Sequence, residues 1–424
     1  MKSLFINSLR WWVGTNLPDE HIFIHPSNRP KKLRDKIQIY FRKWIVHPIK
    51  RRLSKYYLIL LKNVTDIKVI GITGSAGKTT TKEMLASILK TENKTVYSYA
   101  NIDPIYNIPS TILRCNFKAR FLVLEMGVEF PGEMDFYLWL AKPDIGVITN
   151  IYPTHLHFFG DADGVFREKS KLIRRLSEGS VAILNNSDKF LVKLKDSLKA
   201  RTVWFGTGGE VISSQEQLQN DGRMKFLLIF DKDPKKSVWV EIPVVGSQFV
   251  DNALAAAAVA KNLGFSLENI KKGLETYEIP EHRMNIIKFK NGALLLDDSY
   301  NNNPAAAKYT LKTFQKIANK KNKIVIFGDM LELGKLERYY HLKLGKIIGK
   351  MNIDYLIGVG KASKTTVIEA GKILGREKVA WVIKKEMIMP LLVPRIQKNS
   401  IVLIKGSRSI GLDEVVSRLL RRFS

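Results

Sequence analysis

The sequence predicts an α/β fold in which a central domain with a mostly parallel sheet precedes a Rossmann-like C-terminal domain. Three observations lead to this prediction. Short apolar runs alternate with amphipathic stretches from Ile67 onward, and a second alternating set begins near Ala293. A polar, glycine-containing turn at 288–292 lies between the two sets. Such alternation is typical of βαβ units around a parallel sheet.

Residues 1–66 precede these sets and are basic and aromatic. They hold 14 Lys and Arg against four acidic residues, and three of the seven tryptophans. We expect this segment to be helical, because one helical face gathers five apolar residues between basic ones: Ile37, Tyr40, Phe41, Trp44 and Ile45. Two interpretations stay open. The helix packs against the next domain, or it meets an anionic membrane surface or a lipid-linked diphosphate.

The central domain is predicted over 67–290 and the C-terminal domain over 291–424. The strands expected in the central domain are 121–126, 145–149 and 181–184. The strands expected in the C-terminal domain are 293–296, 323–327, 355–359 and 401–404. Residues 207–240 are polar and are expected to form an irregular hairpin region.

Composition narrows the class of protein. A net charge of +29 over 424 residues favours anionic partners such as nucleotides or acidic lipid surfaces. The single cysteine, Cys115, excludes an intramolecular disulfide and a cysteine-based zinc site. We find no apolar run of about 20 residues and no signal peptide pattern. We therefore expect a cytoplasmic protein, with a peripheral position at the inner membrane face as the open alternative.

The strongest local signal is the run IKVIGITGSAGKTT at 67–80. An apolar strand leads into a glycine-rich turn and then a helix, the order of a phosphate-binding P-loop. Glycine N–H groups and the helix N-terminus suit phosphate oxygens. Lys78 would reach the β- and γ-phosphates, and Thr79 would offer a hydroxyl to Mg²⁺. The loop is a shortened relative of the strict pattern, because Ile72 occupies the place of its first glycine.

Two further residues follow predicted strands and are candidate Mg²⁺ ligands. Glu125 lies at the end of 121–126, and His155 follows 145–149. The carboxyl ends of parallel strands are where such sheets bind ligands. Taken alone, a strand-end glutamate is more often solvated, and a lone histidine is more often structural.

With these residues in place, the sequence resembles the Mur ligases, ATP-dependent amide-forming enzymes of cell-wall precursor synthesis. Ordered segments carry the resemblance: 73–80 (TGSAGKTT), 125–127 (EMG), 150–160, 297–304 (DDSYNNNP), 328–334 (GDMLELG) and 405–409 (KGSRS). The last two are similar to the branch that adds D-alanyl-D-alanine to a muramoyl-tripeptide acceptor. The resemblance implies that ATP phosphorylates a substrate carboxylate, and that an amine then displaces phosphate from the acyl phosphate.

The resemblance also implies roles for individual residues. It makes Lys78, His155, Lys169 and Arg283 catalytic. It assigns ATP binding to Thr73, Gly74, Ser75, Gly77, Lys78, Thr79, Thr80, Asn252 (facing adenine), Arg283 (phosphate) and Asp298 (ribose). It assigns Mg²⁺ to Thr79, Glu125, His155 and Lys169, the last as a carbamate. It assigns the substrates to Asn301, Asn303, Lys405 and Arg408. The residue pattern alone would leave Lys169 solvated on a basic helix.

The sequence departs from the family pattern at several positions. Lys171 replaces a usual glutamate, Gln248 and Phe249 replace a His-Asn pair, and 101–109 is a loose version of its motif. Residues 1–66 do not resemble the family's UDP-sugar-binding domain. We therefore expect that domain to be missing or replaced, the acceptor to be UDP- or lipid-linked, and the protein to be a monomer.

Two other functions are compatible with parts of the sequence. A related ligase could act on a lipid-linked or other polymer precursor, although the 328–334 and 405–409 segments argue against a folylpolyglutamate synthase. A basic P-loop protein that binds nucleic acid would fit the charge. The sequence carries no nucleic-acid recognition motif, so no nucleic-acid partner is expected.

Overall fold

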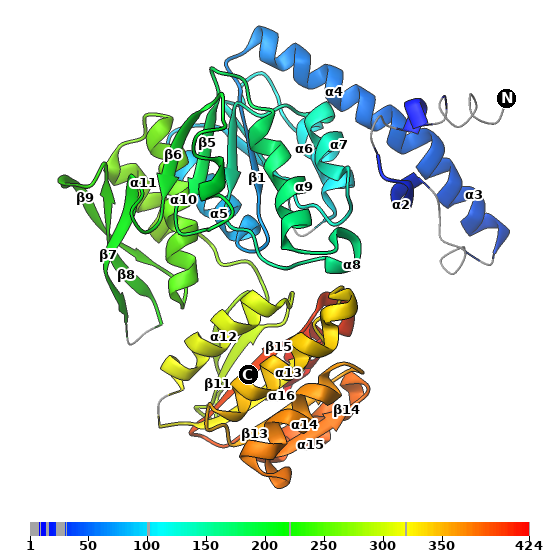
Figure 1. The fold of residues 1–424 in the computed structure, drawn as a ribbon, viewed down its shortest axis with the longest axis vertical. Helices are drawn as coiled ribbons and strands as arrows, with labels where there is room; N and C mark the ends of the chain where they lie inside the picture. Colours follow the sequence, from blue (N-terminus) through cyan, green and yellow to red (C-terminus); the bar gives the residue numbers. More distant parts are fainter. Residues whose placement is uncertain are drawn as a thin grey trace.

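The structure is a computed structural model, and its α/β architecture confirms the predicted fold class. It describes residues 8, 10–13, 17–22, 30, 32–99, 102–219, 222–318 and 320–423. The rest of the predicted segment 1–66, and Asn101 of the loose motif, lie outside the described residues. Two α/β bodies follow one another along the chain, and helices of the N-terminal segment extend from the first body (Figure 1).

The first body is built on a nine-stranded sheet in the order β2-β3-β1-β4-β5-β6-β7-β8-β9. Its strands are β1 Lys68–Thr73, β2 Thr95–Tyr97, β3 Phe121–Glu125, β4 Ile145–Ile148, β5 Val181–Asn185, β6 Arg201–Phe205, β7 Val211–Leu218, β8 Met224–Phe230 and β9 Asp233–Ile242. Strands β1 to β6 pair in parallel. Strand β1 lies between β3 and β4, so the chain passes to both sides of it. Such a reversal of strand order opens a crevice at the carboxyl edge of the sheet.

The region 207–240 is more regular than the sequence suggested. It forms β7, β8 and β9, which pair antiparallel and extend the same sheet. Strand β8 alternates buried and half-buried residues along its whole length. A period of two is typical of a strand with one face on the core. The polar residues of the neighbouring strands β7 and β9 made this pattern hard to recognise in the sequence.

Helices cover the central sheet, as the alternating pattern predicts. They are α5 Lys78–Leu89, α6 Pro104–Leu113, α7 Glu133–Leu140, α8 Leu156–Phe159, α9 Ala162–Arg174, α10 Ser247–Asn262 and α11 Leu267–Glu275. Helix α5 starts directly after the phosphate loop and packs against α10 and α11. A Cβ at Gly273 of α11 would lie 2.3 Å from the Ile88 Cα of α5, so the glycine permits this close packing.

The second body has a six-stranded sheet in the order β10-β11-β15-β12-β13-β14. Its strands are β10 Asn285–Lys288, β11 Leu294–Asp298, β12 Asn322–Gly328, β13 Tyr355–Val359, β14 Val379–Val382 and β15 Ser400–Lys405. Its helices are α12 Pro304–Ile317, α13 Glu337–Gly349, α14 Ser363–Leu374, α15 Ile388–Leu392 and α16 Asp413–Phe423. Only β10 runs antiparallel among these strands, and it joins this sheet although it precedes residue 291.

The described part of the N-terminal segment is helical, as predicted. It contains α2 Asp19–Ile22, α3 Leu33–Phe41, the π-helical turn η2 Arg42–Val46 and α4 His47–Val64. Helix α4 packs one face on α6 and α7, whereas α3 has no buried residue. Of the five apolar residues predicted to share one helical face, Ile37, Tyr40, Phe41 and Ile45 are exposed. Trp44 instead packs against the core, and it lies in the π-turn, which changes the helical phase. Among the described helices, none is long and apolar enough to cross a membrane.

Candidate functional site

A cavity of about 350 Å³ lies where the two bodies meet. Its lining comes from the phosphate loop, from the ends of β3 and β4, from α10, and from the loop after β11. Volumes of this size are typical of small-molecule sites. Most predicted site residues line it: Ser75, Gly77, Lys78, Thr79, Thr80, Glu125, His155, Asn252, Arg283, Asp298, Asn301, Asn303 and Lys405. Thr73, Gly74, Lys169 and Arg408 are not part of this lining.

The phosphate loop is held by the residues that follow β4. The Ala76 N–H donates to Asn150 Oδ1 at 2.9 Å, and Thr149 Oγ1 donates to the Ala76 carbonyl at 2.6 Å. Gly77 has a φ of +81° and precedes the first residue of α5. A Cβ there would lie 2.1 Å from Asn252 Oδ1. The loop can therefore follow this path beside Asn252 because Gly77 has no side chain.

Lys78 and Thr79 point their polar groups at the crevice beside β1. Lys78 Nζ donates to the Gly74 carbonyl at 3.0 Å. Burial lowers the pKa of Lys78, Glu125 opposes that shift, and Arg283 adds to it. Thr79 Oγ1 donates a hydrogen bond to Glu125 Oε1 at 3.1 Å. This contact brings together the two oxygen atoms that are expected to be Mg²⁺ ligands.

Arg283 lies in the connection between the two bodies. It is flanked by His282 and Met284, whose φ values of 62° and 57° place both in the left-handed region. Its guanidinium donates to Thr79 Oγ1 at 3.2 Å and lies 4.4 Å from the centre of the Tyr300 ring. The arginine thus contacts both domains beside the phosphate loop.

A second group of candidate ligands joins the two domains. Glu129, His155 and Glu332 bring one ligand atom each within 4.8 Å of one another. His155 Nδ1 contacts Glu332 Oε2, and burial together with the Glu332 carboxylate raises the pKa of Glu129. Imidazole nitrogen and carboxylate oxygens are suitable ligands for a divalent cation. Glu129 and Glu332 thus join His155, the predicted ligand of a second metal, as further candidate ligands.

Lys169 is buried on α9, which corrects its solvated interpretation. Burial and the charge of Lys78 lower the pKa of Lys169 well below its usual range, against the opposing effect of Glu133 and Glu168. Lysine in such a setting has its neutral amine favoured. This is the protonation state that carbamylation needs.

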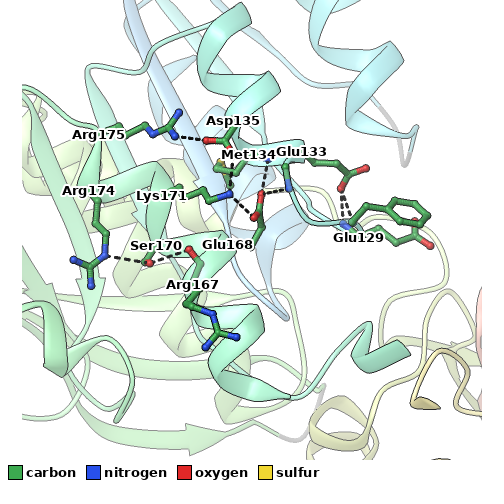
Figure 2. A network of polar contacts seen from close by, with 12 residues as sticks. Glu129, Glu133, Met134, Asp135, Arg167, Glu168, Ser170, Lys171, Arg174 and Arg175 are labelled. Atoms are coloured by element: carbon green, nitrogen blue, oxygen red, sulfur yellow. Dashed lines mark hydrogen bonds and ion pairs between the residues drawn. The ribbon is translucent and has the colours of Figure 1, made fainter. Parts of the chain in front are cut away.

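The residues beside Lys169 form a network around the start of α7 (Figure 2). Glu168 accepts hydrogen bonds from the N–H groups of Gly132 and Met134, both at 3.0 Å. Lys171 forms ion pairs with Glu168 at 2.6 Å and with Asp135 at 2.7 Å. Lys171 and Arg175, which also pairs with Asp135, are therefore the cations of a local charge network.

Asp298 and Lys405 form an ion pair between neighbouring strands. Lys405 Nζ lies 2.7 Å from Asp298 Oδ2 and 2.8 Å from the Asn301 carbonyl, and Thr310 Oγ1 donates to the same Asp298 oxygen at 2.6 Å. Asn303 caps α12 by accepting from the Ala306 N–H. Lys405 and Asn303, two of the predicted substrate residues, therefore also make contacts that stabilise the C-terminal domain.

Arg408 lies outside the cavity lining and is exposed. Its guanidinium is 5.4 Å from the centre of the Tyr300 ring and 3.3 Å from Asp413 Oδ2. Tyr300 lies between Arg408 and Arg283, and it lines the cavity. The aromatic ring therefore connects Arg408 to the site indirectly.

Several site residues were not singled out from the sequence. Glu129 and Glu332 lacked a recognised role, although Glu332 belongs to the 328–334 segment. Lys82 is fully buried one helical turn after Lys78, with its Nζ 3.0 Å from Glu83 and 3.7 Å from Glu125. The spacing of Lys82 from Lys78 could have placed it on the same side of α5.

Comparisons with known proteins agree with this geometry. Residues 72–260 match the Mur ligase middle domain, and residues 282–408 match the Mur ligase glutamate ligase domain. The UDP-N-acetylmuramoyl-tripeptide–D-alanyl-D-alanine ligase of Buchnera aphidicola subsp. Baizongia pistaciae is 30% identical over 86% of this chain and 77% of its own length. The enzyme of the same name from Bacillus subtilis is 30% identical over 87% of this chain and 79% of its own.

Solved structures give the same result. MurF from Acinetobacter baumannii is 30% identical and superposes with a TM-score of 0.80, covering 88% of this chain and 80% of that one. MurF from Thermotoga maritima in complex with ADP is 25% identical with a TM-score of 0.75, over 88% of this chain and 83% of that one. The chain belongs to the Mur ligase family.

Proposed function

We propose that this chain is an ATP-dependent ligase that joins D-alanyl-D-alanine to a muramoyl-tripeptide acceptor through an acyl phosphate. The observation that carries the proposal is the cavity between the two domains. It collects a phosphate loop, paired oxygen ligands and an interdomain arginine in one place. The names of the relatives support this choice of substrates. A UDP-linked and a lipid-linked form of the acceptor are the two candidates.

In this proposal ATP binds along the phosphate loop. The N–H groups of the loop and the start of α5 would contact its phosphates. The Asn252 amide lies beside Gly77, where it could pair with a polar edge of adenine. Lys78 would exchange its hydrogen bond to the Gly74 carbonyl for the phosphates. Asp298, at the carboxyl end of β11 and on the cavity wall, is the proposed ribose contact.

The first reaction joins two anions, so positive charge must offset their repulsion. The acceptor carboxylate attacks the γ-phosphorus and ADP leaves, which gives an acyl phosphate. Lys78 and Arg283 both line the cavity, Arg283 donates to Thr79 next to Lys78, and the two would stabilise the charge on the transferring phosphoryl group. The amine of D-alanyl-D-alanine then attacks the acyl carbon and phosphate leaves, which forms the amide.

The residues present fit Mg²⁺ at two places. Thr79 and Glu125 would hold one ion, since both are oxygen donors and lie in contact. His155 would hold a second, together with Glu129 and Glu332. When bound, the metal would screen phosphate charge. Lys169 would add a carbamate if its neutral amine takes up CO₂ with loss of a proton, and its depressed pKa supports that step.

The test is phosphate release from ATP and Mg²⁺ in the presence of D-alanyl-D-alanine and UDP-N-acetylmuramoyl-tripeptide. Release should require both substrates, with a matching mass gain on the peptide. Lys78→Ala should abolish turnover with an unchanged circular dichroism spectrum. Bound nucleotide without release would reject the UDP-linked acceptor, and the lipid-linked form would then be assayed in the same way.

Contact with an anionic membrane surface through residues 1–66 extends this proposal. A peripheral position at the membrane would bring the enzyme close to a lipid-linked acceptor. The exposed side of the N-terminal helices is both apolar and basic.

A further inference from the structure

The N-terminal arm, defined here as residues 33–64 of α3, η2 and α4, has an exposed apolar stripe. The stripe consists of Leu33, Ile37, Phe41, Ile45, Ile49, Leu53, Tyr56, Leu60 and Val64, all of them exposed. Leu33 is 72% exposed and Ile37 62% exposed. A continuous exposed patch of large apolar side chains usually marks an interaction site, whereas single exposed apolar residues are common and need no explanation.

The stripe lies on one side of the arm because of the π-turn. In α4, a rotation of about 100° per residue keeps Ile49, Leu53, Tyr56 and Leu60 within a narrow sector. A regular α-helix from Phe41 to Ile49 would place the stripe of α3 on a different side. The π-turn takes up about one extra residue, and this rotates α3 by about 100°. Leu33, Ile37 and Phe41 then align with the stripe of α4.

The opposite side of α4 fixes the arm to the central domain. Its buried residues are Pro48, Arg51, Ser54, Leu58 and Leu61. Tyr57 Oη donates to the Cys115 carbonyl at 2.8 Å, and Lys50 Nζ donates to Ser110 Oγ at 2.7 Å. The stripe is therefore presented outward on a supported helix, and α3 extends beyond the central domain (Figure 1).

The charge of the arm selects the kind of partner. Residues 32–64 contain ten Lys and Arg and one acidic residue, Asp35. Lys32, Arg34 and Lys36 are exposed around the start of α3, and Arg42 is exposed in the π-turn. A second copy of the same arm would bring like charges together along both edges of the stripe. An anionic lipid surface instead accepts the apolar side chains and attracts the basic ones.

We propose that the apolar stripe and its flanking basic residues bind an anionic membrane surface, with the arm lying in the plane of the bilayer. At about 1.5 Å per residue the arm is about 48 Å long, which gives many contacts along the surface. This binding does not depend on the proposed ligase reaction. It places the catalytic domains at the membrane as a peripheral protein.

Flotation of the full-length protein with vesicles tests the proposal. One set of vesicles is phosphatidylcholine alone, and the other contains phosphatidylglycerol as well. The stripe variant is Ile37→Ser/Ile49→Ser, and its matched control is Ile368→Ser/Ile373→Ser, which changes two exposed isoleucines on α14. The charge variant is Arg34→Gln/Lys36→Gln, and its control is Arg376→Gln/Lys378→Gln at a similar spacing.

We expect binding to the anionic vesicles only, weakened by added salt. The stripe and charge variants should each lower the bound fraction about tenfold at limiting lipid, and the controls should not. Equal binding to neutral vesicles, no binding, or equal loss in the controls would overturn the proposal. A dimer in light scattering that only the stripe variant dissociates would assign the stripe to a second copy and would overturn it too.

The ligase assay keeps this result separate from the proposed function. With a UDP-linked acceptor and no vesicles, the stripe and charge variants should turn over like the parent protein, because none of the substituted residues lines the cavity. Their circular dichroism spectra should also match the parent. Lost vesicle binding with normal turnover and a normal circular dichroism spectrum supports the membrane role. A changed spectrum in these variants would instead show that the stripe residues help to hold the fold, and it would reject the stripe as a free binding surface.

Discussion

Removing Asp298 should destabilise the C-terminal domain through its partner Lys405. The Lys405 side chain is 2% exposed, and Asp298 is 14% exposed. Asp298→Ala leaves the buried ammonium with the Asn301 carbonyl as its remaining partner. Removing one partner of a buried ion pair lowers the free energy of unfolding by about 3–5 kcal/mol. Because Asp298 is partly exposed, we expect a loss at the lower end of this range, about 3 kcal/mol. For a domain of this size that loss lowers the melting temperature by about 10 °C.

The assay is thermal unfolding followed by circular dichroism for Asp298→Ala, Lys405→Met and the double variant. The double variant should be less destabilised than the sum of the single variants by about 2 kcal/mol, because it leaves no unpaired buried charge. A melting temperature for Asp298→Ala within about 2 °C of the parent would refute this reasoning. Strictly additive losses would show that the two side chains act independently. Adding ATP and Mg²⁺ to each melt then separates nucleotide binding from this stability effect.

Three further predictions concern the site and its surroundings. Gly77→Ala should weaken ATP binding at least tenfold in calorimetry, because its φ of +81° is strained for alanine and the new Cβ would meet Asn252; an unchanged affinity would contradict the loop geometry. Glu125→Gln should raise the Mg²⁺ concentration needed for half-maximal turnover, and an unaltered Mg²⁺ curve would remove Glu125 from the metal site. The hydrogen bond that His282 donates to Asp297 raises the pKa of His282 above 6.5, so this contact stabilises the fold below pH 6.5 and is lost as the pH rises through the raised pKa. His282→Gln should therefore flatten the decline in unfolding free energy above pH 6.5, and an identical pH profile would disprove the contribution.

The strands and the phosphate loop could be predicted because their signals are local. Buried strands form short apolar runs, and the Gly77-Lys78-Thr79 turn stands between a strand and a helix. The predicted C-terminal strands fall within two residues of β11, β12, β13 and β15. The antiparallel strands β7 to β9 were missed as regular strands, since polar residues on their open face interrupt the pattern.

The site itself could be predicted only in part, because its groups depend on contacts between residues that are far apart in the chain. His155 and Glu332 are 177 residues apart in the chain and meet only when the two bodies pack together. The burial of Lys169 likewise depends on the elements that surround α9, and not on the basic residues near it in sequence. His155 was a candidate ligand from its place after a predicted strand, but local patterns do not show which residues meet it. For Lys169 the resemblance to a family was needed to make it a candidate at all.

The π-turn lets the arm carry one residue more than a regular helix would without changing the side on which its apolar stripe lies. Losing one residue from 42–46 and forming a regular helix there would leave seven residue steps between Phe41 and Ile49, about 700° or nearly two full turns. The two halves of the stripe would then still lie on one side. Replacing the π-turn by regular helix at unchanged length would instead turn α3 away from the stripe of α4 by about 100°. The number of residues between the two halves and the presence of the π-turn are therefore linked, and related chains that lack both should keep the same stripe.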